Sequence, residues 1–462
     1  MGALKLHSLK QKLCAIVAAS FVMRLILFFA LPRTPSSLAP DEGTYAFLAK
    51  WISESRPAID FPGFGEGLYL SGRSIILPAS TFIKFGMNEL DAVRVTSSIY
   101  GFLSLCLLAY LCSKLMKTTS SGVKENRKTE YLLLSLLVIY AFLPSHFVWS
   151  NLGLRESPNE FWLIMAFVGV FFLYKEGQPK KPLLAVVIFI SIICSFGSRP
   201  QVGWVLVVTL LIYSMFKLRN KLTYLLISSV LAGLFAGYMT TTSFAYVTSD
   251  LYVAKGNTGA SKLCDGSKAK VVYAGKTYSC VKIGTTIKRE HSLNLAEVAI
   301  NEFELLPDRQ SINGVGAGSK IEPLRCPFEE SSKIGKYECL AFRAPYMTLT
   351  FLFRPLPFID TTSQSSTFAA LENTLWILMF ILIFFRISTA KRIPFFKELA
   401  PSITFFFFYA AGAGSYEGNM GTAFRHKSLI LWVPLLLLFA LFWHKDSQTK
   451  EPRGNNSQEI AV

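Results

Sequence analysis

The run LCAIVAASFVMRLILFFAL, residues 13–31, indicates what kind of protein this chain forms. It is about long enough to cross a hydrocarbon layer of ~30 Å, and basic residues precede it. We interpret it as a retained first membrane span, because it is long for a cleaved signal peptide and no small-residue cleavage site follows it before Arg33. Arg24, inside the run, must then face protein or water rather than lipid.

The composition of the whole chain agrees with this interpretation. Of its 462 residues, 52% are hydrophobic and only 17% are charged, and the mean hydropathy is +0.40. Such a chain does not form one ordinary soluble core. The net charge of +17 would suggest nucleic acid as the partner of a soluble protein. Here much of the Lys and Arg lies in short loops beside apolar runs, where it sets topology. We therefore expect a lipid bilayer around the chain and no nucleic acid.

The fold class expected from the apolar runs is an all-α polytopic membrane protein with about ten transmembrane helices. The expected spans are 13–31, 95–115, 131–149, 161–174, 183–196, 202–216, 222–241, 368–385, 399–416 and 429–443. Every loop that this arrangement places in the cytoplasm is basic, which orients the chain with both termini inside. The modest length and the lack of an evident retention signal favour a bacterial plasma (inner) membrane.

The domain organisation follows from the long polar segments. Residues 1–242 hold the first seven spans and a long first outer loop, 33–86; residues 243–366 form an outer insertion; residues 367–445 hold the last three spans, and 446–462 a disordered cytoplasmic tail.

The insertion is expected to be a small mixed α/β unit. A hairpin is predicted over 271–278 and a helix over 293–306. Four cysteines on an outer face are compatible with two disulfides, for which we expect the nearest-neighbour pairs Cys264–Cys280 and Cys326–Cys339, although the sequence allows three connectivities.

Two adjacent carboxylates follow the first span in LAPDEGTY, residues 38–45. The spacing of Tyr45, Leu48 and Ala49 predicts an amphipathic helix, at whose N-terminus Asp41 would lie. An N-cap aspartate with a neighbouring acid in the first turn explains the pair without any catalytic role.

Acids, arginines and one histidine also gather in the other outer loops. The candidate site residues are Asp41, Glu42, Arg155, Glu156, Arg199, Arg354, Arg425 and His426. A carboxylate can take a proton from a hydroxyl acceptor, and guanidinium groups can hold a phosphate as charge develops on it. The structural alternative is a set of interfacial ion pairs that close the helical bundle.

Three of these segments resemble a known family. DEGTY (41–45) after the first span, FGMNELDAVR (85–94) before the second, and LPS (143–145) ahead of Arg155 and Glu156 are similar to segments of the GT-C integral membrane glycosyltransferases. The similarity is greatest to the protein O-mannosyltransferase and aminoarabinose-transferase type. It covers about residues 1–220, and beyond them only the general plan agrees.

The resemblance implies a GT-C-like fold and a polyprenyl-phosphate-linked sugar as donor. It implies Asp41 as the base, Glu42 as its neighbour in substrate or metal contact, and Glu156 as a second acid. In those families the second acid is more often Asp, whereas this chain has Glu156, directly after Arg155. We also expect phosphate or substrate contacts from five residues that are not part of the resemblance, because they are basic and lie on the predicted outer face. They are Arg155, Arg199, Arg354, Arg425 and His426.

The sequence therefore predicts an enzyme that transfers a sugar to a hydroxyl of a glycan, lipid or protein on the extracytoplasmic face, by inverting displacement. No His or Cys spacing requires a metal, so no cofactor is expected, and a divalent cation on Asp41, Glu42 and Glu156 stays open.

Alternatives from other classes also fit parts of the sequence. An O-antigen or exopolysaccharide polymerase or ligase would use Arg425 and His426, but it leaves Asp41 and Glu42 unexplained. A lipid-linked-sugar flippase is expected to carry polar residues at mid-membrane or broken repeat halves. A non-catalytic assembly partner is the third alternative.

Overall fold

The computed structural model describes residues 9–35, 39, 41–56, 69–119, 127–175, 181–217, 221–241, 244–254, 264, 269–273, 276–291, 327, 333–360, 364–389 and 396–448. The helices are α1 (Leu9–Ala30), α2 (Asp41–Ser53), α4 (Arg73–Lys84), α5 (Glu89–Thr119), α6 (Arg127–Phe142), α7 (Pro144–Trp149), α8 (Glu156–Tyr174), α9 (Lys181–Ser198), α10 (Pro200–Met215), α11 (Lys221–Thr241), α15 (Lys333–Phe353), α16 (Gln364–Thr389), α17 (Phe396–Tyr416), α18 (Met420–Ser428) and α19 (Trp432–Gln448). The strands are β1 (Phe244–Ala254), β2 (Lys270–Tyr273) and β3 (Lys276–His291).

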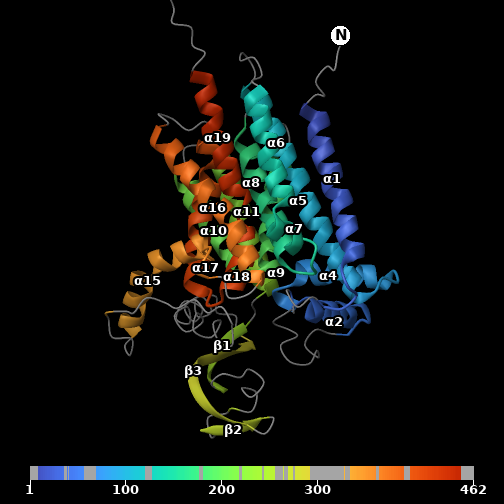
Figure 1. Cartoon of the computed structure of the whole chain (residues 1–462), viewed down its shortest axis with the longest axis vertical. Coiled ribbons are helices and arrows are strands. Elements are labelled where there is room, and N and C mark those ends of the chain that lie inside the picture. Colours follow the sequence, from blue (N-terminus) through green and yellow to red (C-terminus); the bar gives the residue numbers. More distant parts are fainter. Residues whose placement is uncertain are drawn as a thin grey trace, which may run out of the picture.

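The long helices run side by side along the long axis of the molecule (Figure 1). Helices α2 and α4 lie across one end of this bundle, and the strands project beyond the same end. The first turn of α1 and the last turn of α19 lie at the opposite end. We call the end that carries α2 and α4 the site end.

Five helices in the described chain are long and apolar enough to cross a membrane. They are Leu9–Ala30, Glu89–Leu115, Glu156–Tyr174, Lys181–Ser198 and Ser366–Thr389. A sixth span is obtained if α18 and α19, which meet at 51°, form one broken span. The chain is thus a mostly helical, membrane-embedded protein. Each of the ten expected spans overlaps a helix, but a total of ten stays a prediction because the other helices fall below this length or hydropathy.

The predicted third span, 131–149, is wrong as a continuous helix. Helix α6 ends at Phe142, and α7 starts at Pro144. Proline has no N–H and pushes the residue before it out of helical geometry, and Leu143 accordingly has ψ 122°. The break turns His146 of α7 toward Glu160 of α8, with 2.9 Å between Nε2 and Oε2.

The predicted outer turn after the ninth span is also wrong in its conformation. It contains a helix, α18, whose N-cap Asn419 accepts a hydrogen bond from the Gly421 N–H at 2.9 Å. Lys427 at its end is buried and donates to the carbonyls of Leu352 and Arg354 at 3.2 and 3.3 Å. These bonds fix α18 to the end of α15.

The insertion contains the predicted hairpin, in which β2 and β3 pair antiparallel from Lys270 opposite Ser279 to Tyr273 opposite Lys276. Strand β1 pairs with the other edge of β3, so the strand order is β1-β3-β2. A disulfide joins Cys264 to Cys280 as expected, and Cys339 is also disulfide-bonded. The helix expected over 293–306 lies outside the described residues.

The last part of the predicted insertion packs into the bundle instead of standing apart from it. Met347 and Phe351 of α15 are buried in the main core. Gly414 of α17 allows this approach, since a Cβ there would lie 2.7 Å from the Met347 carbonyl oxygen. Helix α15 therefore belongs to the packing of the last helices.

A second, smaller core lies at the site end. It joins buried residues of α2, α4 and the start of α5, including Tyr45, Leu48, Ile75 and Val93. The predicted amphipathic helix after Asp41 is confirmed, because Tyr45, Leu48 and Ala49 are all buried. This core attaches the first loop firmly to the bundle.

Arg24 lies inside the bundle, as expected for a charge within a span. Its side chain is buried, Nη1 donates to the Ser150 hydroxyl at 2.6 Å, and the guanidinium lies 5.4 Å from the Phe147 ring centroid. The arginine therefore ties α1 to the segment after α7.

Candidate functional site

Asp41 is the first residue of α2, where a carboxylate is stabilised by the helix dipole. Its side chain is 53% exposed, and its contacts are to Arg425 of α18, with 3.5 and 3.4 Å from Nη1 and Nη2 to Oδ2. These distances are long for hydrogen bonds. The carboxylate is accessible and loosely held, as a proton acceptor requires.

Glu42, the next residue of α2, is fully buried. Its carboxylate accepts from Arg94 Nε and Nη2 at 2.7 and 2.9 Å and from the Gly153 N–H at 2.8 Å. Arg94 also donates to the carbonyls of Pro32 and Thr34 at 2.7 and 3.1 Å. In this structure the Glu42 carboxylate is held by Arg94 and Gly153, and its predicted contact with substrate or metal stays a prediction.

Glu156 is the centre of a buried cluster at the start of α8. Arg199 Nη2 donates to its Oε1 at 2.5 Å. Arg425 Nε lies 3.1 Å and His426 Nε2 3.5 Å from the same oxygen. The structure therefore brings together five of the predicted residues, with Arg425 linking the exposed Asp41 to the buried Glu156.

Local sequence explains why Arg199 points into this cluster. Pro200 occupies the first position of α10, and Arg199 before it is extended, with φ −153° and ψ 103°. Burial by itself would lower the pKa of Arg199, but the neighbouring Glu156 carboxylate raises that pKa above its ordinary value. The guanidinium therefore stays charged at every physiological pH.

His426 is held from its other side by Glu417, whose carboxylate contacts Nδ1. The Tyr409 hydroxyl donates to the His426 carbonyl at 3.4 Å. A carboxylate at Nδ1 orients the imidazole ring. Nε2 is thereby directed toward Glu156.

Arg155 and Tyr45 border the cluster. Arg155 Nη1 donates to the Ser71 carbonyl at 3.1 Å, in the turn before α4. Tyr45 is buried one turn after Asp41 and interacts electrostatically with Arg155 and Glu156. Burial raises the pKa of the Tyr45 hydroxyl, so it is a neutral donor at pH 7.

Arg354 lies apart from this cluster in its contacts. Both ends of its guanidinium bind Asp360, with 2.9 Å from Nε to Oδ2. Hydrogen bonds from Arg354 and Leu356 to Asp360 hold the pKa of that carboxyl below its ordinary value, although its partial burial acts in the opposite direction. The structure thus places Arg354 in a loop-stabilising pair, and its role in phosphate binding stays a prediction.

Comparisons of the chain with protein-family models, with curated proteins and with solved structures gave no match. The site is therefore interpreted from its own geometry.

The three carboxylates expected to share a divalent cation have basic partners in this structure. Glu42 binds Arg94, and the Arg425 guanidinium contacts both Asp41 and Glu156. Among the residues that the structure describes, no group of three or more His, Cys, Asp or Glu side chains is arranged to hold a metal ion.

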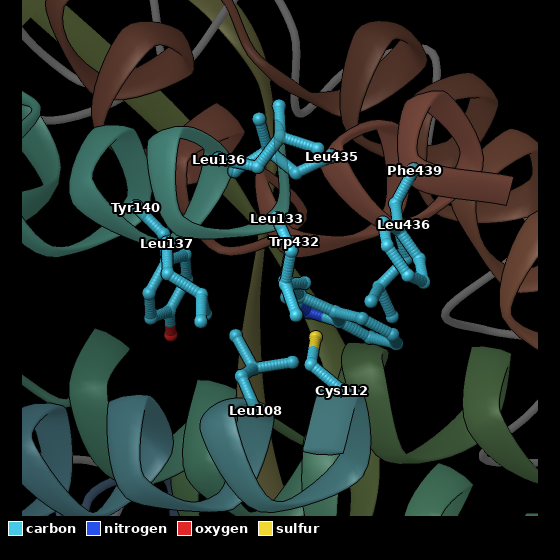
Figure 2. Close-up of a pocket in the computed structure, with 10 residues that line it drawn as sticks. All are labelled: Leu108, Cys112, Leu133, Leu136, Leu137, Tyr140, Trp432, Leu435, Leu436 and Phe439. Atoms are coloured by element: carbon cyan, nitrogen blue, oxygen red, sulfur yellow. The ribbon is translucent and has the colours of Figure 1, made fainter. Parts of the chain in front are cut away.

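A pocket elsewhere in the bundle is apolar and contributes no charged side chain (Figure 2). It lies between α5, α6 and α19. Its lining residues are Leu108, Cys112, Leu133, Leu136, Leu137, Tyr140, Trp432, Leu435, Leu436 and Phe439. It has none of the polar groups that the chemistry of Asp41 or Glu156 needs.

Sequence reasoning gave no role to three residues that the structure places in or beside the site. The sequence predicts Tyr45 only as a residue of the apolar helix face and gives no role to Glu417. Asn159 was not singled out, although it follows Glu156 by three positions on one helix. That spacing is the signal that could have found it.

Proposed function

We propose that this protein is a membrane glycosyltransferase of GT-C-like fold that transfers a sugar from a polyprenyl-phosphate carrier to an acceptor hydroxyl. The observation that supports it best is the continuous set of contacts from Asp41 through Arg425 to Glu156 and Arg199. It combines an accessible carboxylate with buried guanidinium groups. The basic loops assigned to the other end favour an extracytoplasmic site in a plasma (inner) membrane.

In the proposed reaction Asp41 accepts the proton of the acceptor hydroxyl as its oxygen bonds to the anomeric carbon. The bond from that carbon to the phosphate oxygen breaks on the opposite face, and the polyprenyl phosphate leaves with the electron pair. Arg425 and Arg199 stabilise the added negative charge. The sugar is inverted, and no covalent enzyme intermediate forms.

Glu156 has a supporting part in this scheme. Two arginines placed side by side repel each other, and the carboxylate between them offsets that repulsion. Its burial with Arg199 also keeps both guanidinium groups oriented before the donor arrives, which is the preorganisation that electrostatic stabilisation needs.

The phosphate part of the proposal is tested with decaprenyl phosphate and the uncharged decaprenol, bound to purified protein in nanodiscs and measured by native mass spectrometry. Arg425→Gln should weaken decaprenyl phosphate binding by about 10- to 100-fold, the range expected for one charge-assisted hydrogen bond. Decaprenol binding should not change.

Arg56→Gln is the matched control, since Arg56 follows α2 at the same end and pairs only with exposed Glu54 among its described ion pairs. It should bind both ligands as the wild type does. Equal affinity of the wild type for the phosphate and the alcohol would contradict the proposal.

A polymerase or ligase that relies on arginine and histidine is the second candidate, and the His426–Glu417 contact favours it. The two candidates differ in which variant loses activity. A base at Asp41 predicts that Asp41→Asn is inactive and His426→Ala retains partial transfer. The second candidate predicts the reverse order, measured as glycan product in a complemented deletion strain.

A further inference from the structure

Several buried polar atoms at the site end have no hydrogen-bond partner. Among the described residues they include Glu156 Oε2, Asn159 Nδ2 and Oδ1, Ser195 Oγ, Arg199 Nε and His426 Nε2. Asn159 and Ser195 are fully buried, and the other three residues are no more than 7% exposed. Such atoms cost free energy unless a ligand or water satisfies them, so a group of them at one place requires an explanation.

Helix geometry places Asn159 and Ser195 within about one helical turn of each other along the bundle. Asn159 follows Glu156 by one turn on the same face of α8, and Ser195 precedes Arg199 by one turn. Helix α9 runs antiparallel to α8 and packs tightly on it, since a Cβ on Gly169 would lie 2.9 Å from Ile188. Both side chains thus lie about one turn below the Glu156–Arg199 pair.

The chemistry of these atoms differs from that of a phosphate site. A phosphate needs donors only, and the guanidinium groups of Arg199 and Arg425 supply them. The Asn159 amide offers two donors and an acceptor, the Ser195 hydroxyl offers both functions, and Glu156 Oε2 accepts. A mixed set of donors and acceptors matches the hydroxyl groups of a sugar ring, each of which also donates and accepts.

We propose that Asn159, with Ser195 and Glu156 Oε2, forms a subsite that binds hydroxyl groups of the transferred sugar and discriminates between sugars. The inference rests on the proposed function, because it takes the carrier phosphate to bind at the arginines one turn above. It assigns phosphate binding and sugar recognition to separate groups on adjacent turns.

The test compares the affinity of the protein in nanodiscs for decaprenyl phosphate with that for its mannosyl, glucosyl, galactosyl and arabinosyl esters. The wild type should bind at least one ester about tenfold more tightly than the bare phosphate, as expected for one or two added hydrogen bonds. Asn159→Leu, which is nearly isosteric, should abolish this preference and leave the affinity for bare decaprenyl phosphate unchanged.

Thermal unfolding of the ligand-free protein is the second readout. Asn159→Leu should raise its Tm, because the substitution removes an unpartnered buried amide. Ser195→Ala is the milder variant and should lower the preference about threefold. Ser157→Ala is the control on the same turn, since its hydroxyl contacts Ser97 Oγ on α5 at 3.2 Å, and it should keep the full preference.

An Asn159→Leu variant that keeps the wild-type preference would overturn the inference and show that water alone satisfies the amide. A wild type that binds every ester and the bare phosphate equally would also overturn it, while leaving phosphate binding at the arginines intact. A wild type that binds no carrier at all would overturn the proposed function itself.

Discussion

Asp41→Asn should lower sugar transfer by roughly 10²- to 10⁴-fold, the usual contribution of a general base. Asparagine has the shape of aspartate but cannot accept the acceptor proton. The side chain is half exposed and only loosely bound to Arg425, so the fold should tolerate the change. The measurement is the initial rate of transfer with purified protein, together with the Tm of the variant.

Glu54→Gln provides the control for this variant. Glu54 follows the same helix and pairs with Arg56 on the surface, 3.2 Å apart, so its removal should leave both the rate and the Tm unchanged. Near-normal product formation by Asp41→Asn, with normal folding, would contradict the assignment of Asp41 as the base.

The second large effect concerns stability. Glu42→Ala should destabilise the protein by about 3–5 kcal/mol, because it leaves the Arg94 guanidinium buried without its carboxylate. Arg94 is only 1% exposed, so water cannot replace the lost partner. The free energy of unfolding in detergent, or the Tm, measures the loss.

Two comparisons show whether the buried pair is responsible. The double variant Glu42→Leu/Arg94→Met should recover most of the lost stability, because it removes both charges. Glu89→Ala breaks a partly exposed pair with Lys50 at 3.5 Å and should cost no more than about 1 kcal/mol. Equal losses for Glu42→Ala and Glu89→Ala would contradict the structural role given to Glu42.

Hydropathy predicted the positions of the helices well because burial in lipid depends on local composition. The start of α2 at Asp41 and the pairing of β2 with β3 also follow from local signals, which are a carboxylate before an apolar stripe and an alternating run of residues. Pro144 carried the signal for the break after α6, although the apolar run around it favoured one continuous span.

The different roles of Asp41 and Glu42 were harder to predict. Both acids begin the same helix, and the buried stripe of α2 includes Glu42, Tyr45, Ala46 and Ala49, so the spacing could have shown that Glu42 points inward. Its partner Arg94 is distant in sequence, and only packing brings the two together. The same is true of Glu156 with Arg199 and Arg425.

The contact between Asp41 and Arg425 has a consequence for how this protein is made. The two residues are 384 positions apart, so Asp41 in α2 is synthesised long before Arg425 in α18. Chains that stop short of α18 lack Arg425 and His426 altogether. The complete set of groups therefore exists only after α18 has been synthesised, so a chain that stops before α18 cannot form the contacts from Asp41 through Arg425 to Glu156.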